Sequence, residues 1–194
     1  MEKMLTETKR INMFVRMMEA AHLPDDFTDW LMDEGFFKAP ASTKYHGAYE
    51  GGLFDHSFEV TESLVNFTDK MGLQWELPRS PWIVGMFHDL CKIDSYEKVI
   101  DKEGVPLMGS EEVRGEIFHF EHSDESLLPG HGEKSIMLLS RWLQLTEEEI
   151  LCIRYHMGAY ETKDWDFFDK AIRKYPNVLW THTADMYASK VKDV

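Results

Sequence analysis

Cysteines and long apolar runs are scarce in this chain of 194 residues, and each shortage narrows the class of protein. Its two cysteines, Cys91 and Cys152, lie inside apolar helical patterns, so we expect reduced core residues rather than a disulfide framework. No apolar run reaches the roughly 18 residues that a membrane span requires. The first residues also lack the apolar stretch of a secretory signal. These features predict a cytoplasmic protein that does not cross a membrane.

Basic residues are also in short supply, because 21 lysines and arginines stand against 35 acidic residues and give a formal net charge of −14. Proteins that bind extended nucleic acids neutralise phosphates with lysine and arginine. The charge therefore argues against an extended nucleic acid as partner and favours a small substrate. The chain shows no internal repeat, low-complexity tract or linker, which predicts a single domain over residues 1–194.

Helical periodicity fills most of the chain, with apolar residues recurring three and four positions apart. Thr146 and Glu149 form a capping-box pattern, and Pro176 precedes a last helical stretch. Residues 96–120 differ, because the strand-like runs 97–100 and 116–120 flank a turn at 101–104 and predict a β-hairpin. We expect an all-α helical bundle with a small β-hairpin insertion. Residues 1–43 would form an N-terminal helical extension, and 44–190 the core.

The most informative segment is an apolar helix predicted over residues 81–92. Ser80 is a suitable N-cap and Pro81 suits the first helical position. Apolar residues occupy nearly every face, yet His88 and Asp89 lie among them. A buried carboxylate is costly unless it is paired or bound to a metal. Since Lys92 follows one turn later, the segment suggests a metal site that faces an anionic substrate.

Further candidate ligands lie on separate helices or helix ends. His56 follows Gly51-Gly52 early in one predicted helix, and His131 begins another. His156 ends a helix, and Asp185 lies within the last one, among small and apolar neighbours. Metal sites in helical bundles draw their ligands from several helices in this way.

The order His56, His88-Asp89, His131, His156, Asp185 resembles the HD-domain superfamily of metal-dependent phosphohydrolases, in its variant with two additional histidines. The flanking residues from Tyr45 to Ala188 are similar to the HD half of a bacterial exoribonuclease family that degrades RNA from its three-prime end. Two differences stand out. Cys91 occupies a position that is usually glycine, which we expect to alter packing more than chemistry. Residues 1–43 do not resemble the OB-type nucleic-acid module of that family, which favours a small phosphoester over polymeric RNA.

The resemblance implies a centre of two divalent metal ions, and its ligand types do not distinguish among Mg, Mn, Fe, Co, Ni and Zn. One ion would be held by His56, His88, Asp89 and Asp185. Asp89 would bridge to a second ion, held by His131 and His156. Such a pair clamps a phosphoryl oxygen and generates a hydroxide that attacks phosphorus. The implied function is hydrolysis of a small phosphorylated substrate such as a nucleotide or cyclic nucleotide.

Three further residues complete the predicted site. Lys92, catalytic together with Asp89, is placed to hold a phosphate oxygen as a point charge. His46 is a candidate to contact substrate or to protonate the leaving group. His182 shares a helix face with Asp185 and is a candidate to line the pocket or to orient a ligand. For both histidines, an ordinary structural role is an equal alternative.

Two other functions are compatible with the pattern. Mixed-valent di-iron oxygenases use nearly the same six ligands on an HD scaffold and cleave carbon–carbon or carbon–phosphorus bonds with O₂. A nucleotide-sensing module without activity is the third possibility. All six ligand positions and Lys92 are present, which favours an active enzyme over the sensor.

Overall fold

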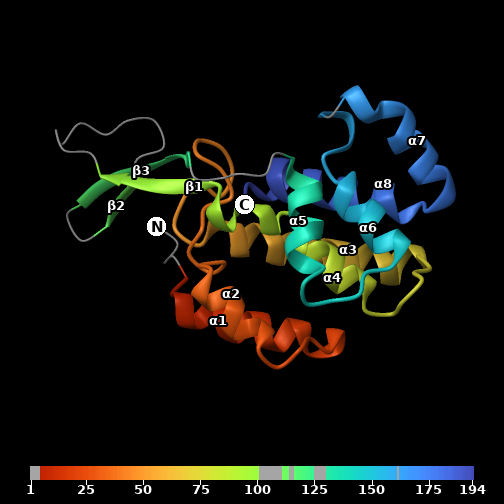
Figure 1. The fold of residues 1–194 in the computed structure, drawn as a ribbon, viewed down its shortest axis with the longest axis horizontal. Helices are drawn as coiled ribbons and strands as arrows, with labels where there is room; N and C mark the ends of the chain where they lie inside the picture. Colours follow the sequence, from red (N-terminus) through yellow and green to blue (C-terminus); the bar gives the residue numbers. More distant parts are fainter. Residues whose placement is uncertain (1–4, 101–110, 114–115, 125–129, 161) are drawn as a thin grey trace.

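A computed structural model describes residues 5–100, 111–113, 116–124, 130–160 and 162–194. Helices dominate this part of the chain (Figure 1). The α-helices are α1 (Glu7–Met18), α2 (Phe27–Asp33), α3 (Gly52–Met71), α4 (Ser80–Phe87), α5 (His131–Leu139), α6 (Glu147–Arg154), α7 (Trp165–Lys174) and α8 (Asn177–Tyr187). Short 3₁₀ helices are η1 (Glu19–Ala21), η2 (Leu90–Asp94), η3 (Gly158–Tyr160) and η4 (Thr162–Asp164), and a π-helical turn, η5 (Ala188–Lys192), continues α8. Within the described ranges, no helix combines the length and apolar character needed to cross a bilayer.

A small antiparallel sheet projects from one end of the helical body (Figure 1). It consists of β1 (Tyr96–Ile100), β2 (Glu111–Val113) and β3 (Glu116–His122), in the order β1-β3-β2. The predicted pairing of residues 97–100 with 116–120 is confirmed, since Val99 lies opposite His119. The insertion is a three-stranded sheet and not a simple hairpin, and the fold is mostly helical, in agreement with the coarse prediction. The predicted turn at 101–104 lies outside the described residues.

The N-terminal segment packs into the same hydrophobic core as the later helices. The ring of Phe14 in α1 lies 5.4 Å from that of Phe37, between centroids, and Phe27 in α2 lies 5.3 Å from Phe87 at the end of α4. All four rings are at most 1% exposed. Edge-to-face aromatic contacts of this kind add to the stabilisation from buried apolar area. Residues 5–37 are therefore part of the scaffold that positions α3 and α4.

The predicted helix over residues 81–92 is interrupted. Helix α4 ends at Phe87, Asp89 has φ −107° and ψ 20°, and η2 begins at Leu90. The amide of Lys92 donates to the carbonyl of Asp89 at 3.0 Å, which is the i to i+3 bond of a 3₁₀ helix. Side chains three positions apart eclipse one another in that geometry. The break therefore places Lys92 directly beside Asp89.

The start of α4 also differs from the prediction, because Arg79 and not Ser80 is the N-cap residue. The Ser80 hydroxyl instead donates to Glu149 Oε1 at 3.0 Å. The capping box at Thr146 and Glu149 is confirmed, with both reciprocal hydrogen bonds formed. Ser80 was predicted to cap its own helix. In the structure it instead connects the start of α4 to the start of α6.

A buried ion pair fastens α1 to the helix that carries His56. The guanidinium of Arg10 donates to both carboxylate oxygens of Asp55, at 2.8 and 2.7 Å. The Arg10 and Asp55 side chains are 4% and 13% exposed. Gly51, with φ +87°, lies against the guanidinium, and a Cβ there would come within 2.2 Å of Arg10 Cζ. The pair thus fixes the first turn of α3, one residue before His56.

We expect Arg10→Ala to lower the free energy of unfolding by about 3–5 kcal/mol, because it leaves the Asp55 carboxylate buried without a partner. Urea unfolding measures this change. Arg173→Ala is the matched control, since Arg173 makes the same two-oxygen contact with Asp169 on the exposed surface of α7. An exposed pair contributes little to stability. Equal losses in the two variants would contradict the assigned role of Arg10.

Candidate metal centre

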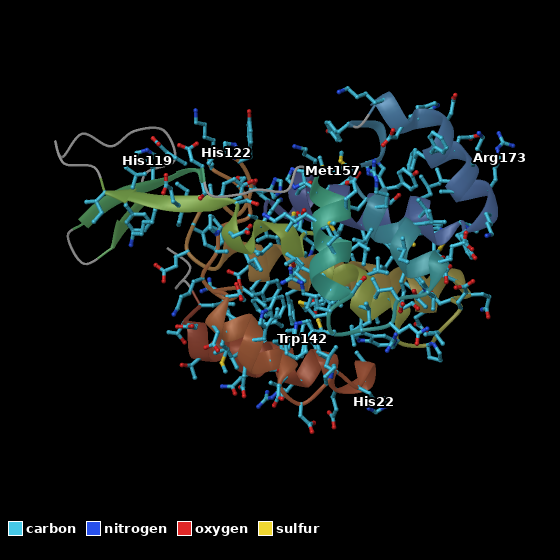
Figure 2. All side chains as sticks on the ribbon, viewed as in Figure 1. His22, His119, His122, Trp142, Met157 and Arg173 are labelled. Carbon is cyan, nitrogen blue, oxygen red and sulfur yellow. The ribbon has the colours of Figure 1, made fainter. Side chains whose placement is uncertain are left out.

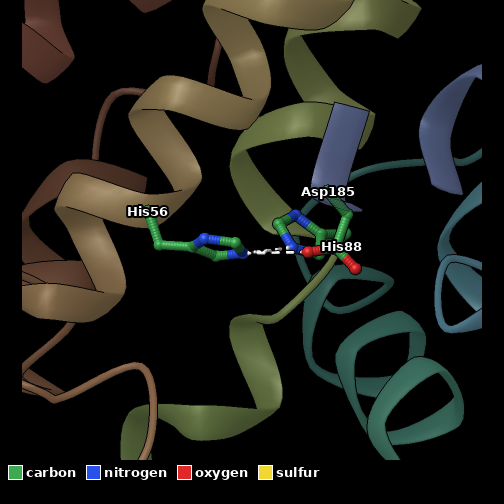
Figure 3. A group of neighbouring side chains, drawn as sticks. All are labelled: His56, His88 and Asp185. Atoms are coloured by element: carbon green, nitrogen blue, oxygen red, sulfur yellow. Dashed lines mark hydrogen bonds and ion pairs between the residues drawn. The ribbon is translucent and has the colours of Figure 1, made fainter. Parts of the chain in front are cut away.

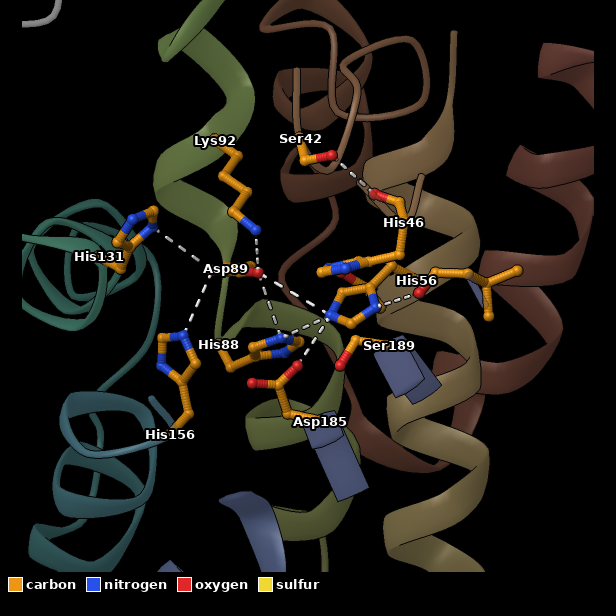
Figure 4. A network of polar contacts seen from close by, with 12 residues as sticks. Ser42, His46, His56, His88, Asp89, Lys92, His131, His156, Asp185 and Ser189 are labelled. Atoms are coloured by element: carbon orange, nitrogen blue, oxygen red, sulfur yellow. Dashed lines mark hydrogen bonds and ion pairs between the residues drawn. The ribbon is translucent and has the colours of Figure 1, made fainter. Parts of the chain in front are cut away.

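The six predicted ligands meet in one place (Figure 4). They form three overlapping groups, in each of which the potential donor atoms lie within 4.8 Å of one another. The groups are His56, His88 and Asp185; His88, Asp89 and His156; and Asp89, Cys91 and His131. Buried histidine and aspartate side chains so arranged could hold a metal ion. Cys91, which we expected to affect packing, is the one member that was not a predicted ligand.

Close helix contacts bring these residues together. A Cβ on Gly85 of α4 would lie 2.6 Å from the Cα of Thr61 in α3, so only glycine permits this approach. His88 follows three residues after this contact. A Cβ on Gly132 of α5 would likewise lie 2.6 Å from the carbonyl oxygen of Arg154, at the end of α6. The second contact brings together His131, at the start of α5, and His156, just beyond the end of α6.

Three buried histidines are oriented by backbone carbonyls. In each of them, Nδ1 donates a hydrogen bond to a main-chain oxygen. His56 donates to Val194 (2.9 Å), His88 to Gly85 (2.8 Å) and His156 to Ile153 (2.7 Å). A carbonyl can only accept, so each Nδ1 carries a proton. In the neutral ring, the lone pair is then on Nε2, which points into the site. Metal-binding histidines are commonly fixed in this way through the nitrogen that does not coordinate.

The imidazole nitrogens and carboxylate oxygens that face the site lie close together, but not all of them form hydrogen bonds with one another. His56 Nε2 is 3.3 Å from His88 Nε2 and 3.2 Å from Asp185 Oδ1 (Figure 3). Among the described residues, Asp89 Oδ1 and His156 Nε2 have no hydrogen-bond partner, although they are 3.3 Å apart. Unsatisfied polar atoms of this kind are costly to bury. A divalent cation would satisfy these lone pairs and carboxylate oxygens together, so the residues fit a metal ion.

The two oxygens of Asp89 face different groups (Figure 4). Oδ2 is 3.5 Å from His88 Nε2 and 3.9 Å from His56 Nε2. Oδ1 is 3.3 Å from His156 Nε2 and 3.8 Å from His131 Nδ1. A carboxylate that presents one oxygen to each side suits the predicted bridging role. The assignment of individual ligands to two ions stays a prediction.

Lys92 is the main counter-charge of Asp89. Its Nζ lies 2.6 Å from Asp89 Oδ2, and both side chains are less than 10% exposed. Burial alone would raise the pKa of Asp89, but Lys92 and His88 hold this pKa well below its usual value. Burial alone would lower the pKa of Lys92, but the facing carboxylate raises it above the usual value. Both groups are therefore charged, and an ammonium group is present beside the candidate ligands.

The two secondary histidines occupy different positions. The His46 ring lies 5.0 Å from the His56 ring, between centroids, and its two nitrogens are buried without a hydrogen-bond partner among the described residues. Burial, with the charges of His56 and Lys92, lowers the pKa of His46 to about 4, so the ring is neutral. His182 Nδ1 lies 2.7 Å from the carbonyl of His156, and this contact holds the loop behind a predicted ligand. A role in binding substrate stays a prediction for both.

A pocket of about 170 Å³ adjoins the third ligand group. Its lining includes Cys91, His131, Lys134, Ser95, Tyr96 and His122. Tyr96 and His122 are cross-strand neighbours in the sheet, with ring centroids 5.2 Å apart (Figure 2 labels His122). The His131 side chain is 41% exposed, in contrast to the other predicted histidine ligands, which are fully buried. Among the six predicted ligands, His131 therefore has the most exposed side chain.

Comparisons with protein-family models, with curated proteins and with solved structures find no match. The resemblance to the HD-domain superfamily thus depends on the residues of this sequence, and it stays a prediction.

If the centre binds a divalent metal, saturating ion should stabilise the fold. At about one hundred times the dissociation constant, the free energy of unfolding should rise by about 2.7 kcal/mol, because the ion binds the folded state alone. Urea unfolding with and without Mn²⁺ or Zn²⁺ measures the effect. Asp89→Asn should abolish it, whereas Asp69→Asn, an exposed change on α3, should not. Equal stabilisation of both variants would place the bound metal elsewhere.

Proposed function

We propose that the protein is a metal-dependent phosphohydrolase that acts on a small phosphoester, such as a nucleotide or a cyclic nucleotide. The observation that carries the proposal is the set of three buried imidazoles whose Nε2 atoms converge on the Asp89 carboxylate. The order of these residues along the chain, which resembles the HD-domain pattern, gives independent support.

Bound divalent ions supply two things to such a reaction, because they lower the pKa of a water molecule and offset the charge of a phosphoryl group. The protein's own residues would do the rest. Asp89 would orient the ions with its two oxygens, and the Nδ1 contacts would keep the imidazoles from turning away. Lys92 would offset the charge that builds up on the phosphoryl oxygens. Fixed groups of this kind need no rearrangement during reaction, which is why they are effective.

The pocket beside His131 supports a small substrate. Its volume is about 170 Å³, and it lies directly beside the predicted ligand His131. The Lys134 ammonium lines it and forms a short ion pair with Asp94, while the Ser95 hydroxyl donates to the carbonyl of Cys91. Tyr96 and His122 form its edge on the sheet, where a base or sugar could rest. His46 would offer a neutral imidazole to a substrate hydroxyl from the opposite side of the centre.

The test is hydrolysis of a panel of nucleoside monophosphates, 2′,3′-cyclic nucleotides and p-nitrophenyl phosphate by metal-free protein reconstituted with one metal at a time. We expect metal-dependent release of phosphate or ring opening, and its loss to background in Asp89→Asn. Lys92→Gln should retain bound metal and lower kcat by about 100-fold, because it removes one charge that stabilises the transition state. Asp69→Asn serves again as the control.

Two outcomes would contradict the proposal. Full turnover in Asp89→Asn would show that the reaction occurs elsewhere. Bound iron with O₂ uptake, and no phosphoester hydrolysis with any metal, would identify the oxygenase alternative instead.

A further inference from the structure

The Cys91 sulfur lies next to two of the predicted metal ligands. Its Sγ is 3.5 Å from His131 Nδ1, and the sulfur, that nitrogen and an Asp89 carboxylate oxygen all lie within 4.8 Å of one another. The side chain is 2% exposed, yet it lines the pocket beside His131. Three different donor types, sulfur, nitrogen and oxygen, thus lie close enough together beside the pocket to share one ion.

A second observation concerns Asp89. Its Oδ1 is buried, faces His131 Nδ1 at 3.8 Å, and has no hydrogen-bond partner among the described residues. Its remaining neighbour is His156 Nε2 at 3.3 Å, so this buried oxygen has ion-pair contacts with two imidazoles but no hydrogen bond to a described residue. A cation placed among the three would correct this, whereas a packing role for the thiol would not.

We propose that Cys91 is a ligand of the metal position defined by Asp89 and His131, which makes this position a sulfur-containing site. The inference extends the proposed function, because it concerns the same metal centre. A cysteine ligand would also reduce the number of metal ions that suit the site. Thiolate and imidazole together favour Zn²⁺, Fe²⁺ or Co²⁺, whereas Mg²⁺ prefers sites made of oxygen ligands.

The backbone holds Cys91 in position for this role. Its amide donates to Ser135 Oγ at 3.0 Å. Ser135 lies four residues after His131 on α5, so the two share a helix face. The bond therefore fixes η2, which carries Cys91, to the helix that carries His131. Glycine at this position could form the same backbone bond but could not supply a sulfur atom.

Coordination replaces a proton with the metal. A cysteine binds a metal ion as the thiolate and not as the thiol. Binding converts the thiol and a divalent ion into a metal thiolate and one released proton, which passes to solvent through the pocket. No electron is transferred. Release of protons is a general property of metal binding to cysteine.

The chain contains two cysteines, which makes the test decisive. Metal-free protein is titrated with Co²⁺, and the absorption band that arises from charge transfer between sulfur and cobalt is recorded together with the amount of cobalt bound. Wild type should develop the band. Cys152→Ala should keep it, because Cys91 is then the only thiol. Cys91→Ser and Cys91→Gly should bind cobalt at the remaining ligands without the band.

Each other result overturns the inference, in a way that separates it from the proposed function. Cobalt bound by wild type without the band would leave a metal centre of nitrogen and oxygen ligands, compatible with hydrolysis but without Cys91. A band lost in folded Cys152→Ala would assign the sulfur to Cys152. Wild type that binds no cobalt would contradict the metal centre as a whole. If the Cys91 variants fail to fold, Cys152→Ala still decides the question.

Discussion

The structure depends on one buried negative charge. The Asp89 carboxylate is 3% exposed and lies where α3, α4, α5 and α6 approach one another. An ion in such a place is stable only if the surrounding residues compensate for its lost hydration. Lys92 supplies a full positive charge, and imidazoles surround the remaining sides. The close contacts at Gly85 and Gly132 can be understood in this light, since each brings helices near enough for their histidines to reach the carboxylate.

Much of the site could be predicted from the sequence, because its signals are local. Gly130 before His131 and Pro176 before the last helix mark helix starts that the structure has. Thr146 and Glu149 encode their capping box within four residues. The strand-like runs 97–100 and 116–120, on either side of a turn signal, predicted the pairing that the structure has. Glycines before His56 and His131 marked two of the ligands, His88 and Asp89 stood out as polar residues in an apolar segment, and the order of all six carried the resemblance.

The remaining features depend on contacts that periodicity does not encode. Residues 81–92 are apolar throughout, so no change of pattern marks the end of α4 at Phe87. The pair of Arg10 and Asp55 joins residues 45 positions apart. Strand β2 has three residues, too few for an alternation to be recognised. The sequence predicted a continuous helix over 81–92, whereas Cys91 lies in η2, after the break. Its position beside His131 could therefore not be predicted from the helical pattern.

The 3₁₀ turn after Asp89 has a consequence for how the site exchanges ions. An α-helix turns about 100° per residue and a 3₁₀ helix about 120°, so over three residues the α-helical path would rotate Lys92 about 60° away from Asp89. In the structure, the Lys92 ammonium pairs with Asp89 Oδ2, which is also the oxygen that faces His56 and His88. A cation bound there would take over the carboxylate, and the ammonium would then be available to an anion. On the proposed function, cation and anion binding would be thermodynamically coupled, each strengthening the other.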